Sequence, residues 1–103
     1  MPTKELIECE RVGLDYFETA PVVVQATQVV AATPERIFDV FLDADSWSRW
    51  AYPITSVDWT SPFPLEVGST RTVWMRAGMV GYEEFIAWEP FRRMAFRFNQ
   101  TIK

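Results

Sequence analysis

A run of strand-like segments separated by short turns fills the second half of this 103-residue chain and restricts its fold more than any other feature. The segments are rich in β-branched and aromatic residues, and the breaks between them, "SPFPLEVGS", "GMVG" and "PF", contain proline or glycine. Strands joined by so few residues pair with their chain neighbours in antiparallel order. The pattern therefore predicts an antiparallel sheet built from residues 54–60, 70–77, 82–89 and 93–102.

The first half of the chain contains the helical signals. Residues 22–31, "VVVQATQVVA", predict a first strand. In "ATPERIFDVFLD", Thr33 is a suitable N-cap, Pro34 occupies the first helical position, and an apolar stripe follows. A second short helix is predicted in "DADSWSRW". We expect an α+β domain over residues 21–103, preceded by an acidic N-terminal arm over residues 1–20.

Pairing the last strands assigns their side chains to two faces. The turn at "PF" predicts these opposite pairs: Phe85 with Phe96, Ala87 with Met94, and Glu84 with Arg97. A loop centred on Met79 adds Met75 opposite Phe85, and Arg76 opposite Glu84. The apolar face then consists of Val73, Met75, Phe85, Ala87, Met94, Phe96 and Phe98. The other face carries a ladder of Arg76, Glu84 and Arg97 beside Trp74, Ile86 and Trp88. A one-residue bulge would invert part of this register.

Composition excludes several kinds of chemistry. The chain has no histidine and one cysteine, Cys9, so histidine-based catalysis and the usual zinc or iron sites are ruled out, and we expect neither a metal nor a cofactor. The net charge is −4, and the arginines of the second half are read as cross-strand ion-pair partners rather than a nucleic-acid surface. No apolar run approaches the ~20 residues of a membrane span, and the N-terminus lacks a signal-peptide pattern. A cytoplasmic protein without a membrane span is expected.

The candidate chemical groups lie on the predicted sheet. Glu83 falls on the apolar face opposite Phe98, where desolvation would raise its pKa, unless it lies close enough to the strand end to reach water. Glu83, Tyr82 and Arg71 are the candidate catalytic residues. Trp47 and Trp50 share one face of the second helix, with Trp50 expected as a buried anchor and Trp47 at the mouth of a cavity.

Several segments together resemble a known family. They are residues 29–42 with "AATPERIFDVF", residues 47–53 with two tryptophans, residues 66–76, and residues 83–98 with "WEPFRRMAF". The pattern, over residues 22–103, is similar to the START-like helix-grip superfamily and most closely to its SRPBCC polyketide cyclase/dehydrase-like proteins. The resemblance implies a helix-grip-like antiparallel sheet with two short helices after the first strand. It also implies two further strands and a long C-terminal helix, which would follow Lys103 and are missing from this chain.

The resemblance further implies a cavity between sheet and helices that binds a small hydrophobic molecule: a lipid, a sterol or an aromatic polyketide. The candidate ligand-binding residues are Phe38, Phe41, Trp47, Trp50, Val73, Met75, Glu83, Phe85, Ala87, Met94, Phe96 and Phe98. Two alternatives remain open. The first is a cyclase or dehydratase acting on a polyketide-like substrate, and the second is a non-enzymatic subunit of a homodimer. A homodimer would also cover the apolar outer side chains Trp74, Ile86 and Trp88, as would the N-terminal arm.

Overall fold

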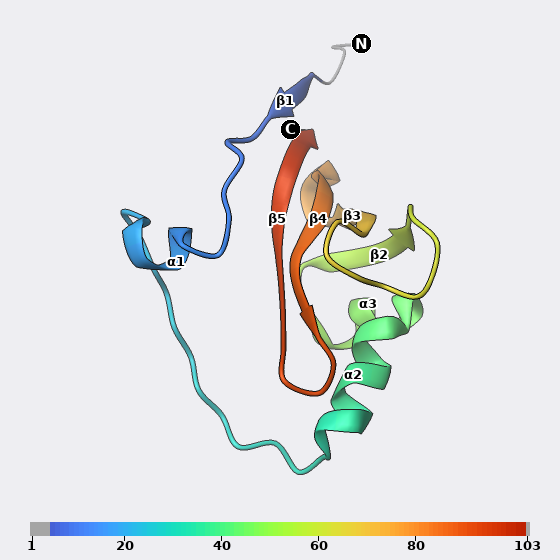
Figure 1. Cartoon of the computed structure of the whole chain (residues 1–103). Helices are drawn as coiled ribbons and strands as arrows, with labels where there is room; N and C mark the ends of the chain where they lie inside the picture. The colour runs from blue at the N-terminus through green and yellow to red at the C-terminus, as the bar shows by residue number, and fades with distance from the viewer. Residues whose placement is uncertain (1–4, 103) are drawn as a thin grey trace.

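Residues 5–102 form an α+β structure built on a five-stranded antiparallel sheet (Figure 1). The computed structural model describes residues 5–102, so residues 1–4 of the expected arm and Lys103 lie outside the described residues. The strands are β1 (Leu6–Glu8), β2 (Ile54–Trp59), β3 (Thr70–Met75), β4 (Val80–Glu89) and β5 (Arg93–Ile102), and they lie in the order β1-β5-β4-β3-β2. The predicted antiparallel sheet and the helix-grip-like α+β class are confirmed.

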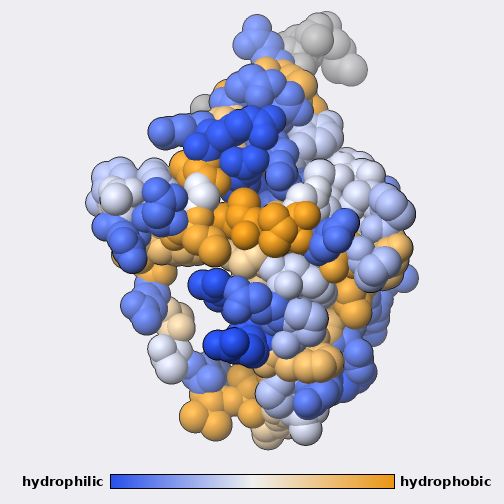
Figure 2. Space-filling model, in the orientation of Figure 1, coloured by the Kyte–Doolittle hydropathy of each residue, from blue (hydrophilic) through white to orange (hydrophobic). Residues whose placement is uncertain are grey.

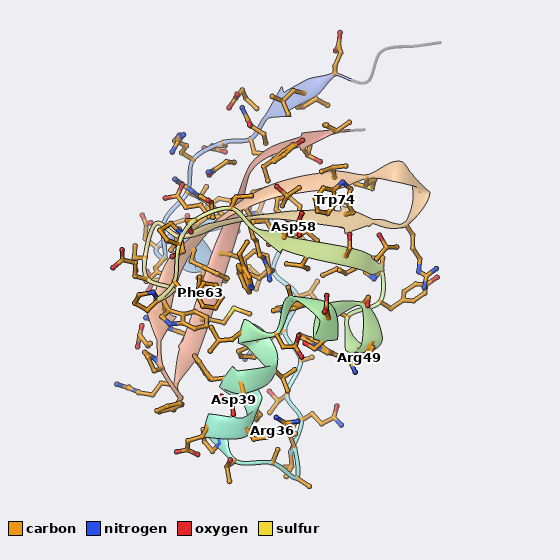
Figure 3. The ribbon with its side chains drawn as sticks, turned by 90° about the vertical axis from the view of Figure 1, so that its right-hand side faces the viewer. Arg36, Asp39, Arg49, Asp58, Phe63 and Trp74 are labelled. Atoms are coloured by element: carbon orange, nitrogen blue, oxygen red, sulfur yellow. The ribbon has the colours of Figure 1, made fainter. Side chains whose placement is uncertain are left out.

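The helices lie in two places. In the arm, α1 (Tyr16–Thr19) forms a single turn; α2 (Pro34–Leu42) and α3 (Trp47–Trp50) follow later, joined by the 3-10 turn η1 (Ala44–Ser46). Thr33 caps α2, because its side-chain oxygen accepts a hydrogen bond from the Arg36 amide at 3.2 Å. Figures 1 and 3 show α2 and α3 together on one side of the sheet, which we call the inner face.

The strand predicted at residues 22–31 is wrong. These residues form an extended segment without strand pairing that arcs from α1 to α2 (Figure 1). Val24 and Val29 are almost fully exposed. β-branched residues favour a strand because they pack well on a half-buried pleated surface, and no strand of residues 5–102 lies beside this segment to provide one.

The turn of the β3–β4 hairpin lies two residues earlier than the loop that the sequence suggested. Ala77 and Gly78 both have positive φ, 66° and 74°, within the 3-10 turn η2 (Arg76–Gly78), so β4 begins at Val80. The predicted pairs of Met75 with Phe85 and of Arg76 with Glu84 are therefore wrong. Instead, Arg71 lies opposite Glu83.

A bulge changes the end of the β4–β5 hairpin nearest its turn. Phe85 lies opposite Phe96 and Glu84 opposite Arg97, as predicted. The register then shifts between Phe85 and Ala87, so the predicted pair of Ala87 with Met94 is wrong: Ala87 pairs with Ala95, and Trp88 with Met94. The shift brings Trp88, expected on the outer face, against the inner-face ring of Phe85, with centroids 5.4 Å apart.

The N-terminal arm follows the free edge of β5. β1 pairs with the end of β5, and the Cys9 amide donates to the Asn99 carbonyl at 2.9 Å. Further along, Arg97 donates to the Val12 carbonyl at 3.2 Å. Between arm and sheet lies a hollow of about 370 Å³, which we call the β5 hollow, and Figure 2 shows hydrophobic surface on this side of the molecule. The hollow is lined by Cys9, Glu10, Val12, Gly13, Tyr16, Phe17, Ile86, Phe96, Arg97 and Phe98.

Candidate functional site

An ion pair between Arg71 and Glu83 lies buried in the middle of the inner face. The two residues are directly opposite each other on β3 and β4, so both side chains project to the same side of the sheet. Nε of Arg71 donates to Oε1 of Glu83 at 2.7 Å, and the side chains are only 1% and 3% exposed. Two of the three candidate catalytic residues are thus brought together.

Aromatic rings surround the guanidinium group of Arg71. Its central carbon lies 4.2 Å from the ring centroid of Trp47 and 4.6 Å from that of Phe96. The rings of Phe85 and Trp59 are slightly farther away, at 5.4 and 5.7 Å. Ring faces attract a cation, most strongly where water is excluded. The aromatic rings and Glu83 together stabilise a charge that burial alone would disfavour.

Burial also determines how the pair titrates. Loss of hydration raises the pKa of the Glu83 carboxyl above its ordinary value, although attraction and hydrogen bonding to Arg71 oppose the change. Burial likewise lowers the pKa of Arg71 against the opposing effect of Glu83. Because an arginine pKa starts so high, Arg71 remains a cation at neutral pH. The alternative that Glu83 reaches water at a strand end is wrong, because its side chain is enclosed.

Tyr82, the third candidate catalytic residue, does not belong to this cluster. It pairs with Thr72 on β3, and neighbouring residues of a strand point to opposite faces. Since Arg71 and Glu83 occupy the inner face, Tyr82 belongs to the outer one, where it is half-buried. Figure 3 shows Trp74 and Asp58 on the side of the sheet away from α2 and α3.

The aromatic and aliphatic candidates divide between core and surface. Val73, Phe85, Ala87, Phe38 and Trp47 are buried. Phe41, Met75 and Met94 are half-buried and pack against the core formed by Trp47, Val57 and Val73. By contrast, Phe96 and Phe98 on β5 are 36% and 37% exposed, and both line the β5 hollow. Exposed aromatic surface therefore lies directly beside the buried ion pair.

The roles expected for the two tryptophans of α3 are reversed. Trp47 is 4% exposed and Trp50 is 49% exposed. The Trp47 indole N–H donates to the Phe41 carbonyl at 3.0 Å while its ring lies over Arg71, so Trp47 is the anchor. Trp50, at the end of this four-residue helix, packs on Trp47 and lines an apolar surface hollow of about 390 Å³ with Val30 and Ile37.

Sequence reasoning missed two aromatic residues of the inner face. Trp59 lies near both Arg71 and Phe85, and its position two residues after buried Val57 on β2 was a signal that could have found it. Trp88 was missed because no local sequence pattern predicts the bulge in β4. It packs on Phe38, and both line a hollow of about 270 Å³ that includes Phe63 of the β2–β3 loop (Figure 3).

Residues 5–102 contain no group of three or more histidine, cysteine or acidic side chains arranged to hold a metal ion. None of the helices in this part of the chain is long and apolar enough to span a bilayer.

The fold and site define a class of protein, an α+β helix-grip-like sheet with an aromatic inner face. Sequence comparison then identifies the family. The profile described as "Polyketide cyclase / dehydrase and lipid transport" matches residues 21–103, and the chain belongs to this family.

Three curated mycobacterial proteins, one from Mycobacterium bovis and two from strains of Mycobacterium tuberculosis, are each 59% identical to this chain over 92 residues. All three are described only as uncharacterized proteins. The alignment covers 89% of this chain and 55% of each relative, so the chain spans about half the length of the curated relatives it matches. No solved structure matches the chain significantly.

Proposed function

We propose that this chain binds a small hydrophobic molecule against the inner face of its sheet, next to Phe96 and Phe98. The observation that carries the proposal is the partial exposure of these two rings beside the buried Arg71–Glu83 pair. The family description, which includes lipid transport and polyketide chemistry, supports the same class of ligand.

The test is a fluorescence titration of the chain with a fatty acid, a sterol and an aromatic polyketide. Trp47 and Trp59 both lie close to Arg71, so a ligand on this face is expected to change tryptophan emission in a saturable way. Phe98→Ser should weaken binding about tenfold, because it removes most of one buried aromatic contact. Phe63→Ser is the matched control, since Phe63 is an exposed phenylalanine that lines a different hollow. Equal effects of the two variants, or no saturable change with any ligand class, would contradict the proposal.

A second candidate function is acid–base catalysis of a cyclase or dehydratase type. The observation that favours it is the raised pKa of Glu83 beside a fixed cation, since a carboxyl group that titrates closer to neutral pH is a better general acid or base. Enzymatic turnover by the chain with a polyketide-like substrate, abolished in Glu83→Gln, would establish this function. Full activity in Glu83→Gln would exclude the role proposed for this residue.

The homodimer, the cytoplasmic location and the division into arm and domain at residue 20 stay predictions. Oligomeric state is measured by the size-exclusion mass of the chain at several concentrations. A mass that rises with concentration supports self-association through exposed apolar residues such as Trp74. A constant monomer mass would exclude the homodimer.

A further inference from the structure

Arg71 has two donor nitrogens whose hydrogen bonds no atom of residues 5–102 accepts. Its Nε is engaged by Glu83, but among residues 5–102 no atom accepts a hydrogen bond from Nη1 or Nη2, although both nitrogens are buried. Buried donors without an acceptor cost free energy, even where aromatic faces partly compensate a cation. The inner face therefore contains a charged hydrogen-bonding group with free capacity, held in position by its ion pair.

Phe96 lies between these donors and the exposed part of the inner face. Its ring centroid is 4.6 Å from the guanidinium carbon, and the residue is about one third exposed. Trp47, which is nearer to Arg71, is buried and held by its bond to the Phe41 carbonyl. Of the two closest rings, Phe96 is thus the one that can turn aside, and its movement would open Arg71 to a molecule on the inner face.

The charge of the pair restricts what Arg71 can accept. Arg71 and Glu83 already neutralise each other in a site shielded from water. A carboxylate ligand would add an uncompensated negative charge there, which is costly to bury. A neutral carbonyl oxygen accepts the same hydrogen bonds without adding charge.

We propose that Arg71 determines ligand specificity by donating hydrogen bonds from Nη1 and Nη2 to a neutral carbonyl oxygen of a hydrophobic ligand, with Phe96 turning aside to admit it. This inference rests on the proposed function. By this hydrogen bonding, Arg71 selects ketones and esters over hydrocarbons and over fatty-acid anions of similar size.

Three probes of nearly equal shape test the selection: 2-acetylnaphthalene, 2-ethylnaphthalene and 2-naphthoate. Each competes with Nile red for the full chain at neutral pH. The acetyl compound is expected to bind about tenfold more tightly than the ethyl compound, because a hydrogen bond from a charged donor outweighs the loss of carbonyl hydration. It should also bind more tightly than 2-naphthoate.

Two variants assign the preference to Arg71. In the double variant R71M/E83Q, which leaves no unpaired charge, the acetyl and ethyl compounds should bind equally. The variant R76M is the matched control, because Arg76 is exposed and packs on Tyr52 away from the site; it should retain the wild-type preference. The comparison of the three probes on the wild-type chain needs no variant and stands even where the double variant fails to fold.

The outcomes separate this inference from the proposed function. Equal binding of all three probes, or tightest binding of 2-naphthoate, overturns the carbonyl selection and leaves hydrophobic binding intact. An acetyl preference that persists in a folded R71M/E83Q removes Arg71 as its cause. If no probe displaces Nile red or binds alongside it, and lipids give no response either, both the carbonyl selection and the proposed function are overturned.

Discussion

Two adjacent glutamates on β4 form ion pairs with arginines on opposite faces of the sheet, and their pKa values are shifted in opposite directions. Glu83 and Arg71 are enclosed by aromatic rings on the inner face, with side chains at most 3% exposed. Glu84 and Arg97 meet at 3.1 Å on the outer face, with side chains 24% and 14% exposed. Identical residue types at neighbouring positions thus have very different solvation.

The hydrogen-bond partners of the two carboxylates explain the difference. Glu84 accepts hydrogen bonds from Asn99 at 3.0 Å and from Arg97, and these interactions lower its pKa despite some burial. Glu83 has Arg71 as its hydrogen-bonding partner, and burial outweighs that interaction to raise its pKa. A polar network therefore stabilises the charged form on one face, while desolvation disfavours it on the other.

The largest expected effect comes from breaking the inner pair. Glu83→Leu leaves Arg71 as an unpaired buried cation and should lower the free energy of unfolding by about 3–5 kcal/mol, measured by urea denaturation. The double variant R71M/E83L removes both charges and should recover most of the loss. If the double variant were as unstable as the single one, the unpaired charge would not be the cause.

Breaking the outer pair should matter less. Glu84→Leu is expected to lower the free energy of unfolding by about 1 kcal/mol or less, because Arg97 still reaches water and donates to the Val12 carbonyl. Urea denaturation at low and high salt measures it. The loss should shrink with added salt, unlike that of Glu83→Leu. A loss as large as that of Glu83→Leu would show that the two faces are equally desolvated.

The smallest effect is a difference in pH dependence. The raised pKa of Glu83 gives a contribution to stability that is present below the ordinary glutamate pKa and is lost as the pH rises through the raised pKa. The lowered pKa of Glu84 gives the opposite: its contribution is present above the ordinary pKa and is lost as the pH falls through the lowered one.

Urea denaturation from acidic to neutral pH tests this contrast. The free energy of unfolding of Glu83→Gln, taken relative to that of wild type, should increase as the pH rises. That of Glu84→Gln, relative to wild type, should increase as the pH falls. If the free energies of unfolding of the two variants depended on pH in the same way, the pKa values of both carboxylates would be shifted in the same direction.

Parts of the inner site were predictable from the sequence, but their assembly was not. Alternation along β4 placed Glu83 and Phe85 on one face, and the short turn before β5 predicted the pairs of Phe85 with Phe96 and Glu84 with Arg97. Arg71 was predicted as a candidate residue, but the sequence did not predict that it pairs with Glu83. The tight turn at Ala77 and Gly78 changed which arginine faces the glutamates, and φ values of this kind depend on how the whole hairpin closes.

What the sequence by itself determined was local: the capped start of α2 at Thr33, the approximate positions of β2 to β5, and the alternation of faces along each strand up to its bulges. These follow from side-chain effects on the nearby backbone and from turn residues that act over a few positions. Only the tertiary structure decided that Arg71 meets Glu83, that Trp47 rather than Trp50 is buried, and that residues 22–31 do not join the sheet. The physical reason is that pairing, burial and edge strands depend on which segments come together in space. A single bulge or tight turn changes those contacts without leaving a pattern in the neighbouring residues.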